Sequence, residues 1–143
     1  MTRMQVHIAE DEQELKRIAP VMLELRDHFD TDGLIAQIRR QQQDGYIVAY
    51  VEEDGEVLAV AGFVITSKLA WHKHLYVDDL VTAAARRSRG AGRCLMDWLK
   101  QHAIGNGCTQ LHLDSGVQRF RAHRFYLREG FYINSHHFAI TEL

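Results

Sequence analysis

The chain has 143 residues, of which 46% are hydrophobic and 25% are charged, and its formal net charge at pH 7 is −2. These values are typical of one globular domain, residues 1–143, and argue against a protein built mainly to bind nucleic acid. No apolar run is long enough for a membrane span, and we expect no secretory leader. Two cysteines do not make a disulfide framework, so we expect a cytoplasmic protein with reduced thiols.

The first third of the chain is predicted to hold a strand followed by two helices. Residues 4–9 resemble a short strand, and Asp11 followed by Glu14 is typical of a capping box at a helix N-terminus. Apolar residues then recur at helical spacing, but Pro20 interrupts the run and is expected to kink or split that helix. Thr31 begins a second helical pattern.

The rest of the chain alternates strands with helices. Two β-rich runs flank Asp54-Gly55, a strong local signal for a hairpin. The further predicted elements are strands at 74–82 and 109–114, a helix that begins at Ala91 and stops at 105–107, a helix at 117–129, and a β-rich tail at 131–143 that forms one long strand or two short ones. The order β-α-α-β-β-β-α-β-α-β predicts a mixed α/β sheet, with antiparallel pairing first and a parallel strand–helix–strand unit later.

Residues 86–92, RRSRGAG, stand between an apolar strand and a helix with apolar periodicity. The first turn of a helix presents unpaired N–H groups and a partial positive charge, and glycines let a bulky anion approach the backbone. The arginines add full charges, so the loop is suited to a pyrophosphate. The alternative interpretation is a basic surface turn. The Walker A and dinucleotide-binding patterns do not fit this stretch.

Residues 87–92 match [QR]-x-x-G-x-[GA], a motif of the GNAT superfamily of N-acetyltransferases, and the chain resembles that family. A second motif, A-x-x-x-Y-x-x-x-G-F, is matched by Ala122, Tyr126, Gly130 and Phe131. The predicted order of elements also agrees over nearly the whole chain. The resemblance implies a GNAT-type, mostly antiparallel sheet with helices on both faces. It also implies an acyltransferase that uses acetyl-coenzyme A (acetyl-CoA).

The resemblance further implies where the donor binds. Backbone amides of one loop would hold the pyrophosphate, and that loop consists of Arg87, Ser88, Arg89, Gly90, Ala91 and Gly92. Backbone groups at the end of the fourth strand would pair with the pantetheine arm, and they belong to Leu80, Val81 and Thr82. Tyr126 would protonate the leaving thiolate. Arg119 stands where the family often has asparagine, and is expected instead to bind a cofactor phosphate or an acidic group of the acceptor.

Direct attack of an amine on a thioester requires a group that takes the proton of the amine. Asp78 and Asp79 on the fourth strand are the candidates, and His74, His112 and Asp114 are weaker ones. Successive strand residues face opposite sides of a sheet, so only one of the two aspartates is expected to face the cleft. A bulge would change which one it is.

Nine histidines invite a metal-site interpretation, but their spacing lacks a zinc pattern, so no metal is expected. The acceptor is expected to be a primary amine of a small molecule or a peptide, with no nucleic-acid or membrane partner. A homodimer is compatible with the resemblance. Two alternatives stay open. One is a GNAT enzyme that acts on a protein amine or uses another acyl group, and the other is a non-catalytic acyl-CoA sensor.

Overall fold

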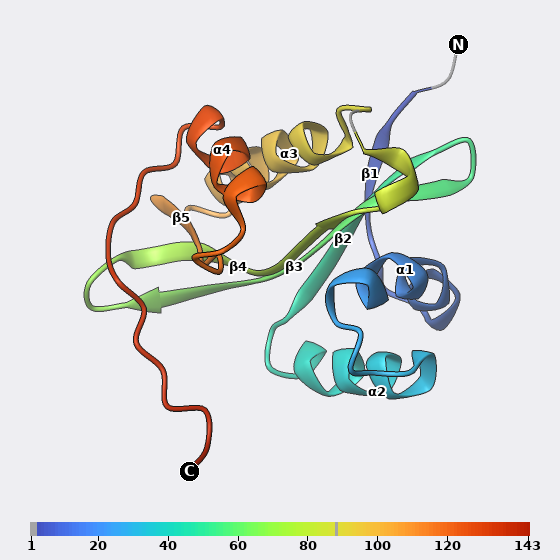
Figure 1. Ribbon diagram of the computed structural model, residues 1–143, viewed down its shortest axis with the longest axis horizontal. Coiled ribbons are helices and arrows are strands. Elements are labelled where there is room, and N and C mark those ends of the chain that lie inside the picture. The colour runs from blue at the N-terminus through green and yellow to red at the C-terminus, as the bar shows by residue number, and fades with distance from the viewer. Residues whose placement is uncertain (1–2, 88) are drawn as a thin grey trace. The chain divides into compact units, whose positions relative to one another are not determined.

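A computed structural model of the chain describes residues 3–87 and 89–143. The elements follow the order β1, α1, α2, β2, β3, β4, a short 3₁₀ helix, α3, β5 and α4 (Figure 1). The chain forms two compact units, one ending at His112 and one beginning at Leu113. The first unit holds the long strands and the helices α1, α2 and α3, and the second holds α4 and the C-terminal tail.

The sheet contains five strands that lie in the order in which they occur in the chain, β1-β2-β3-β4-β5. Each neighbouring pair among the first four strands is antiparallel. The strands are β1 (Gln5–Ile8), β2 (Ile47–Glu53), β3 (Glu56–Lys68), β4 (His72–Thr82) and β5 (Gln110–Leu113). The prediction of a mostly antiparallel sheet within an α/β fold is confirmed.

The hairpin predicted at Asp54-Gly55 joins β2 to β3. Both residues have positive φ values, 53° and 75°. A two-residue type I′ turn requires such values, because its backbone twist matches that of the strands it joins. The local sequence therefore accounts for this part of the sheet without help from the rest of the chain.

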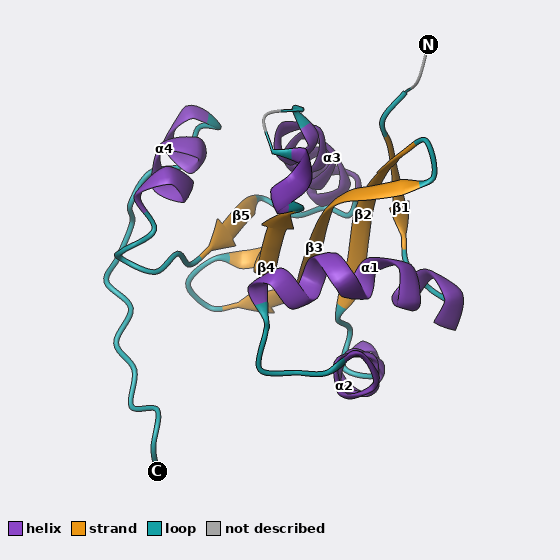
Figure 2. Cartoon of the chain, turned by 45° about the vertical axis from the view of Figure 1, so that its right-hand side comes forward, coloured by secondary structure: helices purple, strands orange, loops and turns teal. Residues whose placement is uncertain are grey.

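Helices cover both faces of the sheet in the first unit. The helices α1 (Glu12–Leu25) and α2 (Thr31–Gln42) lie on one face, and α3 (Ala91–Gly105) lies on the other (Figure 2). The predicted capping box opens α1, where the backbone N–H of Glu14 donates to Asp11 Oδ1 at 2.8 Å. In α2, the backbone N–H of Gly33 donates to the side chain of Asp30 at 2.7 Å.

The prediction that Pro20 splits the first helix is wrong, because α1 continues through this residue to Leu25. Proline removes the N–H that would bond to the carbonyl of the residue four positions earlier, which is Lys16. Both Lys16 and Pro20 are exposed, so water can satisfy that carbonyl. The buried face of α1 stays intact, and its packing holds the helix together.

Apolar side chains fill the space on both sides of the sheet. The first group, between the sheet and the helices α1 and α2, includes Leu15, Ile18, Met22, Leu34, Ile38, Val48 and Val60. On the other face, Phe63 of β3 packs against Trp98 and His102 of α3. Burying a side chain of this size stabilises the fold by roughly 1.5–3 kcal/mol. The core therefore fixes α1 and α3 on opposite faces.

The second unit differs from the prediction at two places. The helix α4 (Phe120–Arg128) begins three residues later than expected, because the N–H of Arg119 closes a turn on the carbonyl of Gly116 at 3.0 Å. The tail at 131–143 contains no strand, and its large apolar side chains are mostly exposed. A high content of β-branched and aromatic residues shows that the side chains would suit a half-buried sheet, but it does not provide a neighbouring strand. No strand of the described chain pairs with the tail.

Candidate active site

The loop before α3 ends at Gly90, which has a φ of 85° and forms the N-cap of the helix. This left-handed conformation favours glycine, because a Cβ would crowd the following carbonyl. Among the described residues, no side chain caps the helix. The N–H groups of its first turn are therefore available to an external anion. The predicted loop residue Ser88 lies outside the described residues.

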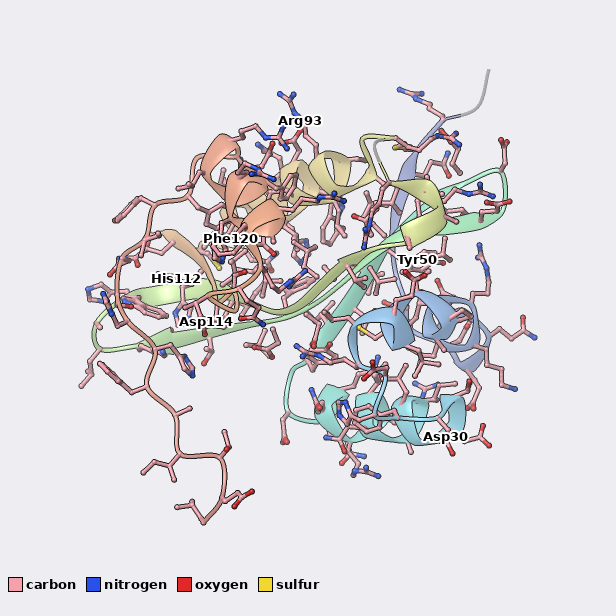
Figure 3. The ribbon with its side chains drawn as sticks, viewed as in Figure 1. Asp30, Tyr50, Arg93, His112, Asp114 and Phe120 are labelled. Atoms are coloured by element: carbon pink, nitrogen blue, oxygen red, sulfur yellow. The ribbon has the colours of Figure 1, made fainter. Side chains whose placement is uncertain are left out.

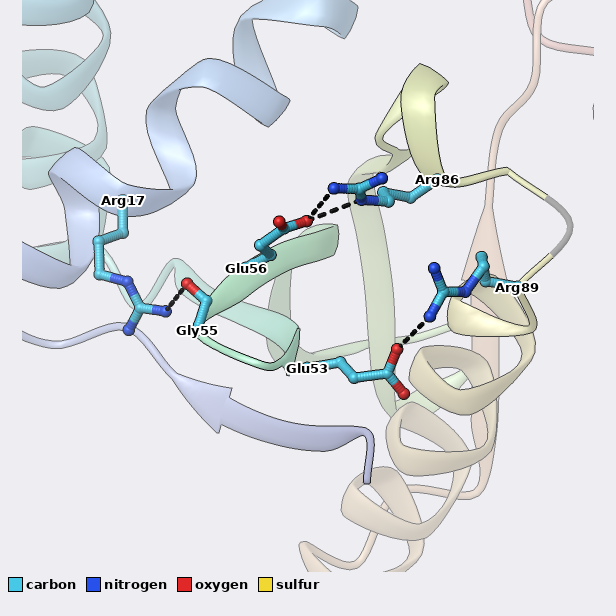
Figure 4. A network of polar contacts seen from close by, with 6 residues as sticks. All are labelled: Arg17, Glu53, Gly55, Glu56, Arg86 and Arg89. Atoms are coloured by element: carbon cyan, nitrogen blue, oxygen red, sulfur yellow. Dashed lines mark hydrogen bonds and ion pairs between the residues drawn. The ribbon is translucent and has the colours of Figure 1, made fainter. Parts of the chain in front are cut away.

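Arg89 of this loop and Arg86 just before it form ion pairs with the acidic hairpin of β2 and β3 (Figure 4). Arg89 Nη2 lies 2.6 Å from Glu53 Oε1, and the exposed fraction of that glutamate side chain is only 11%. Arg86 Nε donates to Glu56 Oε2 at 2.7 Å. Arg87 is exposed in the loop, and Arg93 is exposed on the first turn of α3 (Figure 3). The positive charge of the loop is thus partly balanced from within the chain.

The end of β4 supplies the second predicted contact with the donor. Leu80, Val81 and Thr82 are half-buried and pair with β3 along one edge. The neighbouring strand β5 approaches β4 at the opposite end, where the N–H of Thr109 donates to the carbonyl of Lys73 at 3.0 Å. Since β5 is only four residues long, this arrangement suits two strands that diverge toward Thr82.

A cavity of about 380 Å³ lies in the first unit, between the helices α1 and α2 and the strand β4. Its walls combine apolar side chains with two carboxylates and one guanidinium. The lining residues are Met22, Arg26, His28, Phe29, Leu34, Gln37, Ile38, Gln41, Tyr46, Asp78 and Asp79. A pocket with apolar walls and a few polar groups is the usual form of a small-molecule site.

A bulge in β4 brings both predicted aspartates to this cavity. Gly62 of β3 pairs with Asp79 and Phe63 pairs with Val77, so Asp78 is the extra residue between them. Both aspartates line this cavity, and which of them faces the reacting amine stays a prediction. A bulge breaks the alternation of a strand and re-aims its side chains.

The two aspartates differ in their surroundings. Asp79 Oδ1 accepts from Arg26 Nε at 2.8 Å, and its Oδ2 accepts from the hydroxyl of Tyr46 at 2.6 Å. Arg26 Nη2 also donates to the carbonyl of Asp78 at 3.1 Å. Burial and the neighbouring Asp79 carboxylate raise the pKa of Tyr46 far above its usual range. The Tyr46 hydroxyl therefore keeps its proton and donates a hydrogen bond to Asp79. The carboxylate of Asp79 has two hydrogen-bond partners, whereas Asp78 is an exposed residue.

This network depends on a close approach at Gly62. An ideal Cβ on this residue would lie 1.6 Å from the Tyr46 hydroxyl oxygen, so only glycine lets the phenol pass. Arg26, Tyr46 and Gly62 were not predicted from the sequence. A tyrosine before a strand and a glycine within one have ordinary structural interpretations, and no spacing connects these three residues.

The second unit carries Tyr126 and Arg119. Tyr126 lies on α4, is 8% exposed, and contacts the rings of Phe125 and Phe131 edge-on. Burial raises the pKa of Tyr126, and the nearby charge of Arg119 lowers it in part. The phenol therefore keeps its proton at neutral pH, as a general acid requires. Arg119 is the N-cap residue of α4.

The weaker base candidates have packing partners. His74 is 1% exposed and stands edge-on to Trp71, and His112 stacks on Trp71 with 3.5 Å between ring centroids. Asp114 Oδ2 lies 3.4 Å from His137 Nδ1. Among the described residues, no group of three His, Cys, Asp or Glu side chains could hold a metal ion. No described helix is long and apolar enough to cross a membrane.

Known proteins resemble this chain in sequence and in fold. The model of the Acetyltransferase (GNAT) family matches residues 8–131. The uncharacterized N-acetyltransferase YhdJ of Bacillus subtilis (strain 168) is 34% identical over 83% of this chain and 85% of its own. The aminoalkylphosphonate N-acetyltransferase of Salmonella typhimurium (strain LT2) is 33% identical over 46% of this chain and 42% of its own.

The fold is also that of a solved acetyltransferase. The aminoglycoside N-acetyltransferase AAC(6')-Iy in complex with CoA superposes with a TM-score of 0.86, covering 99% of this chain and 96% of its own at 14% identity. Fold and sequence together define the chain as an acyltransferase. It belongs to the Acetyltransferase (GNAT) family.

Proposed function

We propose that this enzyme transfers the acetyl group of acetyl-CoA to a primary amine of a small molecule. The observation that carries the proposal is the start of α3, which no described side chain caps, with Gly90 in a left-handed conformation and Arg87, Arg89 and Arg93 nearby in the sequence. The names of the relatives support both substrates, since AAC(6')-Iy was solved with CoA and is named for aminoglycosides, and another relative is named for an aminoalkylphosphonate. The family match spans both compact units, which supports one catalytic domain over residues 1–143.

The donor would lie along the loop and the end of β4. In this proposal, the amides of residues 87–92, Ser88 included, bind the pyrophosphate, and Arg89 exchanges its partner Glu53 for a phosphate. The backbone of Leu80, Val81 and Thr82 pairs with the pantetheine arm in the manner of an added strand. Arg119 binds a phosphate of the donor or an acidic group of the acceptor.

The reaction needs a neutral amine, an oxyanion donor and a proton for the leaving group. Asp78, exposed at the bulge, is proposed as the base that takes the amine proton, directly or through water. The amine nitrogen then attacks the thioester carbonyl carbon, and a strand amide near Val81 stabilises the oxyanion. When the C–S bond breaks, Tyr126 protonates the thiolate. Asp79, held by Arg26 and Tyr46, is proposed to position the bulge.

Titration calorimetry with acetyl-CoA and a thiol-release assay over a panel of amines test this function. Gly90→Val and Arg89→Ala should each weaken acetyl-CoA binding, because the first strains the N-cap and the second removes a charge. Gly105→Ala, at the other end of α3 in open space, is the matched control. Binding without turnover on any amine would favour an acyl-CoA sensor, and no binding would refute the proposal.

A further inference from the structure

The end of α1 is bonded to β4 just before the segment that is proposed to meet the donor, residues 80–82. Arg26, the C-cap residue of α1, donates from Nε to Asp79 Oδ1 at 2.8 Å and from Nη2 to the carbonyl of Asp78 at 3.1 Å. The exposed fraction of the Asp79 side chain is only 14%, and charges attract each other more strongly where less water surrounds them. These bonds fix the strand at its bulge.

A second bond joins the same helix to the chain directly after residues 80–82. The strand β4 ends there, and a 3₁₀ helix (Ala84–Arg86) leads on to the loop before α3. Glu24 Oε1, in the last turn of α1, accepts from the backbone N–H of Ala84 at 2.8 Å, sixty residues later in the chain. The first N–H groups of a helix lack partners within it, and the N-cap residue Ala83 has no polar side chain to supply one. Glu24 therefore caps this short helix from another element.

The two contacts enclose the part of the chain where both ends of the donor site meet. Residues 80–82 pair with β3 along one edge, and Arg26 and Glu24 hold the chain on either side of them. The pantetheine arm and the pyrophosphate belong to one molecule, so the strand and the loop must lie at one fixed separation to bind both. A site that is held in this arrangement before binding avoids the cost of ordering it.

We propose that Glu24 is a positioning residue for the donor. Its bond to Ala84 holds the end of β4 and the loop before α3 so that both can bind one molecule of acetyl-CoA, while Arg26 secures the other side of residues 80–82. The inference rests on the proposed donor site and assigns to it a residue of α1 that need not touch the donor. Arg26 also lines the cavity beside α1, so one helix end contacts both the cavity and the donor strand.

Two substitutions of Glu24 separate its hydrogen bond from its charge. Glu24→Ala removes the oxygen that accepts from Ala84, whereas Glu24→Gln keeps a side-chain oxygen that can accept the same bond. We expect calorimetry to show an acetyl-CoA Kd about three- to tenfold higher in Glu24→Ala and within about twofold of the wild type in Glu24→Gln. Glu12→Ala, the same substitution at an exposed position at the other end of α1, is the matched control and should leave the Kd unchanged.

A fragment of the donor distinguishes positioning from a change within the loop itself. ADP carries a pyrophosphate but no pantetheine arm, so its binding does not depend on the separation of the strand and the loop. In competition with acetyl-CoA, ADP should therefore have equal inhibition constants in the wild type and in Glu24→Ala. With an amine that the wild-type enzyme acetylates, Glu24→Ala should raise the KM for acetyl-CoA and leave kcat nearly unchanged.

The outcomes separate the inference from the function beneath it. An unchanged Kd for acetyl-CoA in Glu24→Ala would overturn the inference and leave acetyl transfer standing. A loss that Glu24→Gln does not restore would also overturn it, as would an equal loss for ADP or a lower Tm in Glu24→Ala without weaker binding. Failure of the wild type to bind acetyl-CoA would refute the proposed function itself.

Discussion

Gly62 of β3 lies between β2 and β4, and its lack of a side chain leaves room for the ring of Tyr46. It pairs with Val48 of β2 and Asp79 of β4, and the phenol of Tyr46 crosses directly over its Cα. From this position the hydroxyl of Tyr46 donates to Asp79 Oδ2 at 2.6 Å. A Cβ atom at position 62 would therefore displace the Tyr46 hydroxyl from its hydrogen bond with Asp79.

We expect Gly62→Ala to lower the free energy of unfolding by about 1–3 kcal/mol, because the methyl group overlaps the ring of Tyr46 and forces it away. Urea denaturation followed by circular dichroism measures the change. Gly105→Ala, where an added Cβ meets nothing within 4 Å, should leave stability equal or slightly higher. Equal effects of the two substitutions would contradict the importance of the close approach.

Tyr126 can be tested by removing one oxygen atom. If its hydroxyl protonates the leaving thiolate, Tyr126→Phe should lower kcat by roughly a hundredfold. The KM for acetyl-CoA should change little, since the ring and its contacts with Phe125 and Phe131 remain. Steady-state kinetics with an amine that the wild-type enzyme acetylates measures both constants. Full turnover in the variant would remove Tyr126 from the mechanism.

The hairpin of β2 and β3 forms ion pairs with two arginines that precede α3. Its carboxylates at Glu53 and Glu56 hold Arg89 and Arg86 (Figure 4). An incoming phosphate must compete with Glu53 for Arg89. The acidic tip of the hairpin is thus part of the electrostatics of the loop, although it lies more than thirty residues earlier.

We expect Glu53→Gln to strengthen acetyl-CoA binding by roughly two- to tenfold at low salt, because Arg89 loses its internal counter-charge. Calorimetry at two salt concentrations measures this, and the gain should shrink as salt screens the charges. Glu56→Gln, whose partner Arg86 lies before the motif, is the control. Weaker binding in Glu53→Gln would mean that Glu53 holds Arg89 in its binding position instead.

Elements with local causes could be predicted from the sequence. The capping box at Asp11 and the turn at Asp54-Gly55 each contain their own hydrogen bonds or dihedral preferences. Pro20 was misjudged because packing of the other face of α1 outweighs one lost hydrogen bond. The tail at 131–143 was misjudged because β-rich composition says nothing about a neighbouring strand.

The same distinction applies to the site. The loop at 87–92 is contiguous, so its glycines and arginines could be recognised together. The cavity is assembled from α1, α2, β2 and β4, and no spacing in the sequence relates Arg26, Tyr46 and Asp79. The bulge at Asp78 depends on the pairing of β4 with β3, which is a property of two strands.

For the molecule as a whole, folding is coupled to the protonation of His102. This side chain stacks on Trp98 with 4.5 Å between ring centroids and stands edge-on to Phe63. Burial lowers the pKa of His102 from its ordinary value of 6.5. The unfolded chain therefore binds a proton at this residue at a higher pH than the folded protein does.

The contribution of His102 to stability should be complete above about pH 6.5 and should fall as the pH drops through the pKa of the folded state. Thermal unfolding between about pH 8 and pH 5 measures it, and the Tm of the wild type should decrease toward acid. In His102→Gln, the decrease should be smaller, since no proton is taken up there. Parallel Tm profiles for the two proteins would contradict the coupling.

The bulge at Asp78 also sets the side of the strand to which each later N–H and C=O group points. Along a strand, successive peptide groups point alternately to the neighbour on one side and to the neighbour on the other. One additional residue exchanges the two sides for all residues that follow. Which N–H and C=O groups of Leu80, Val81 and Thr82 turn toward β3, and which turn away from it, is therefore decided at Asp78. A strand that kept Asp78 but lost the bulge would pair one residue out of the present register, and it would turn toward β3 the groups that the pantetheine arm is proposed to meet.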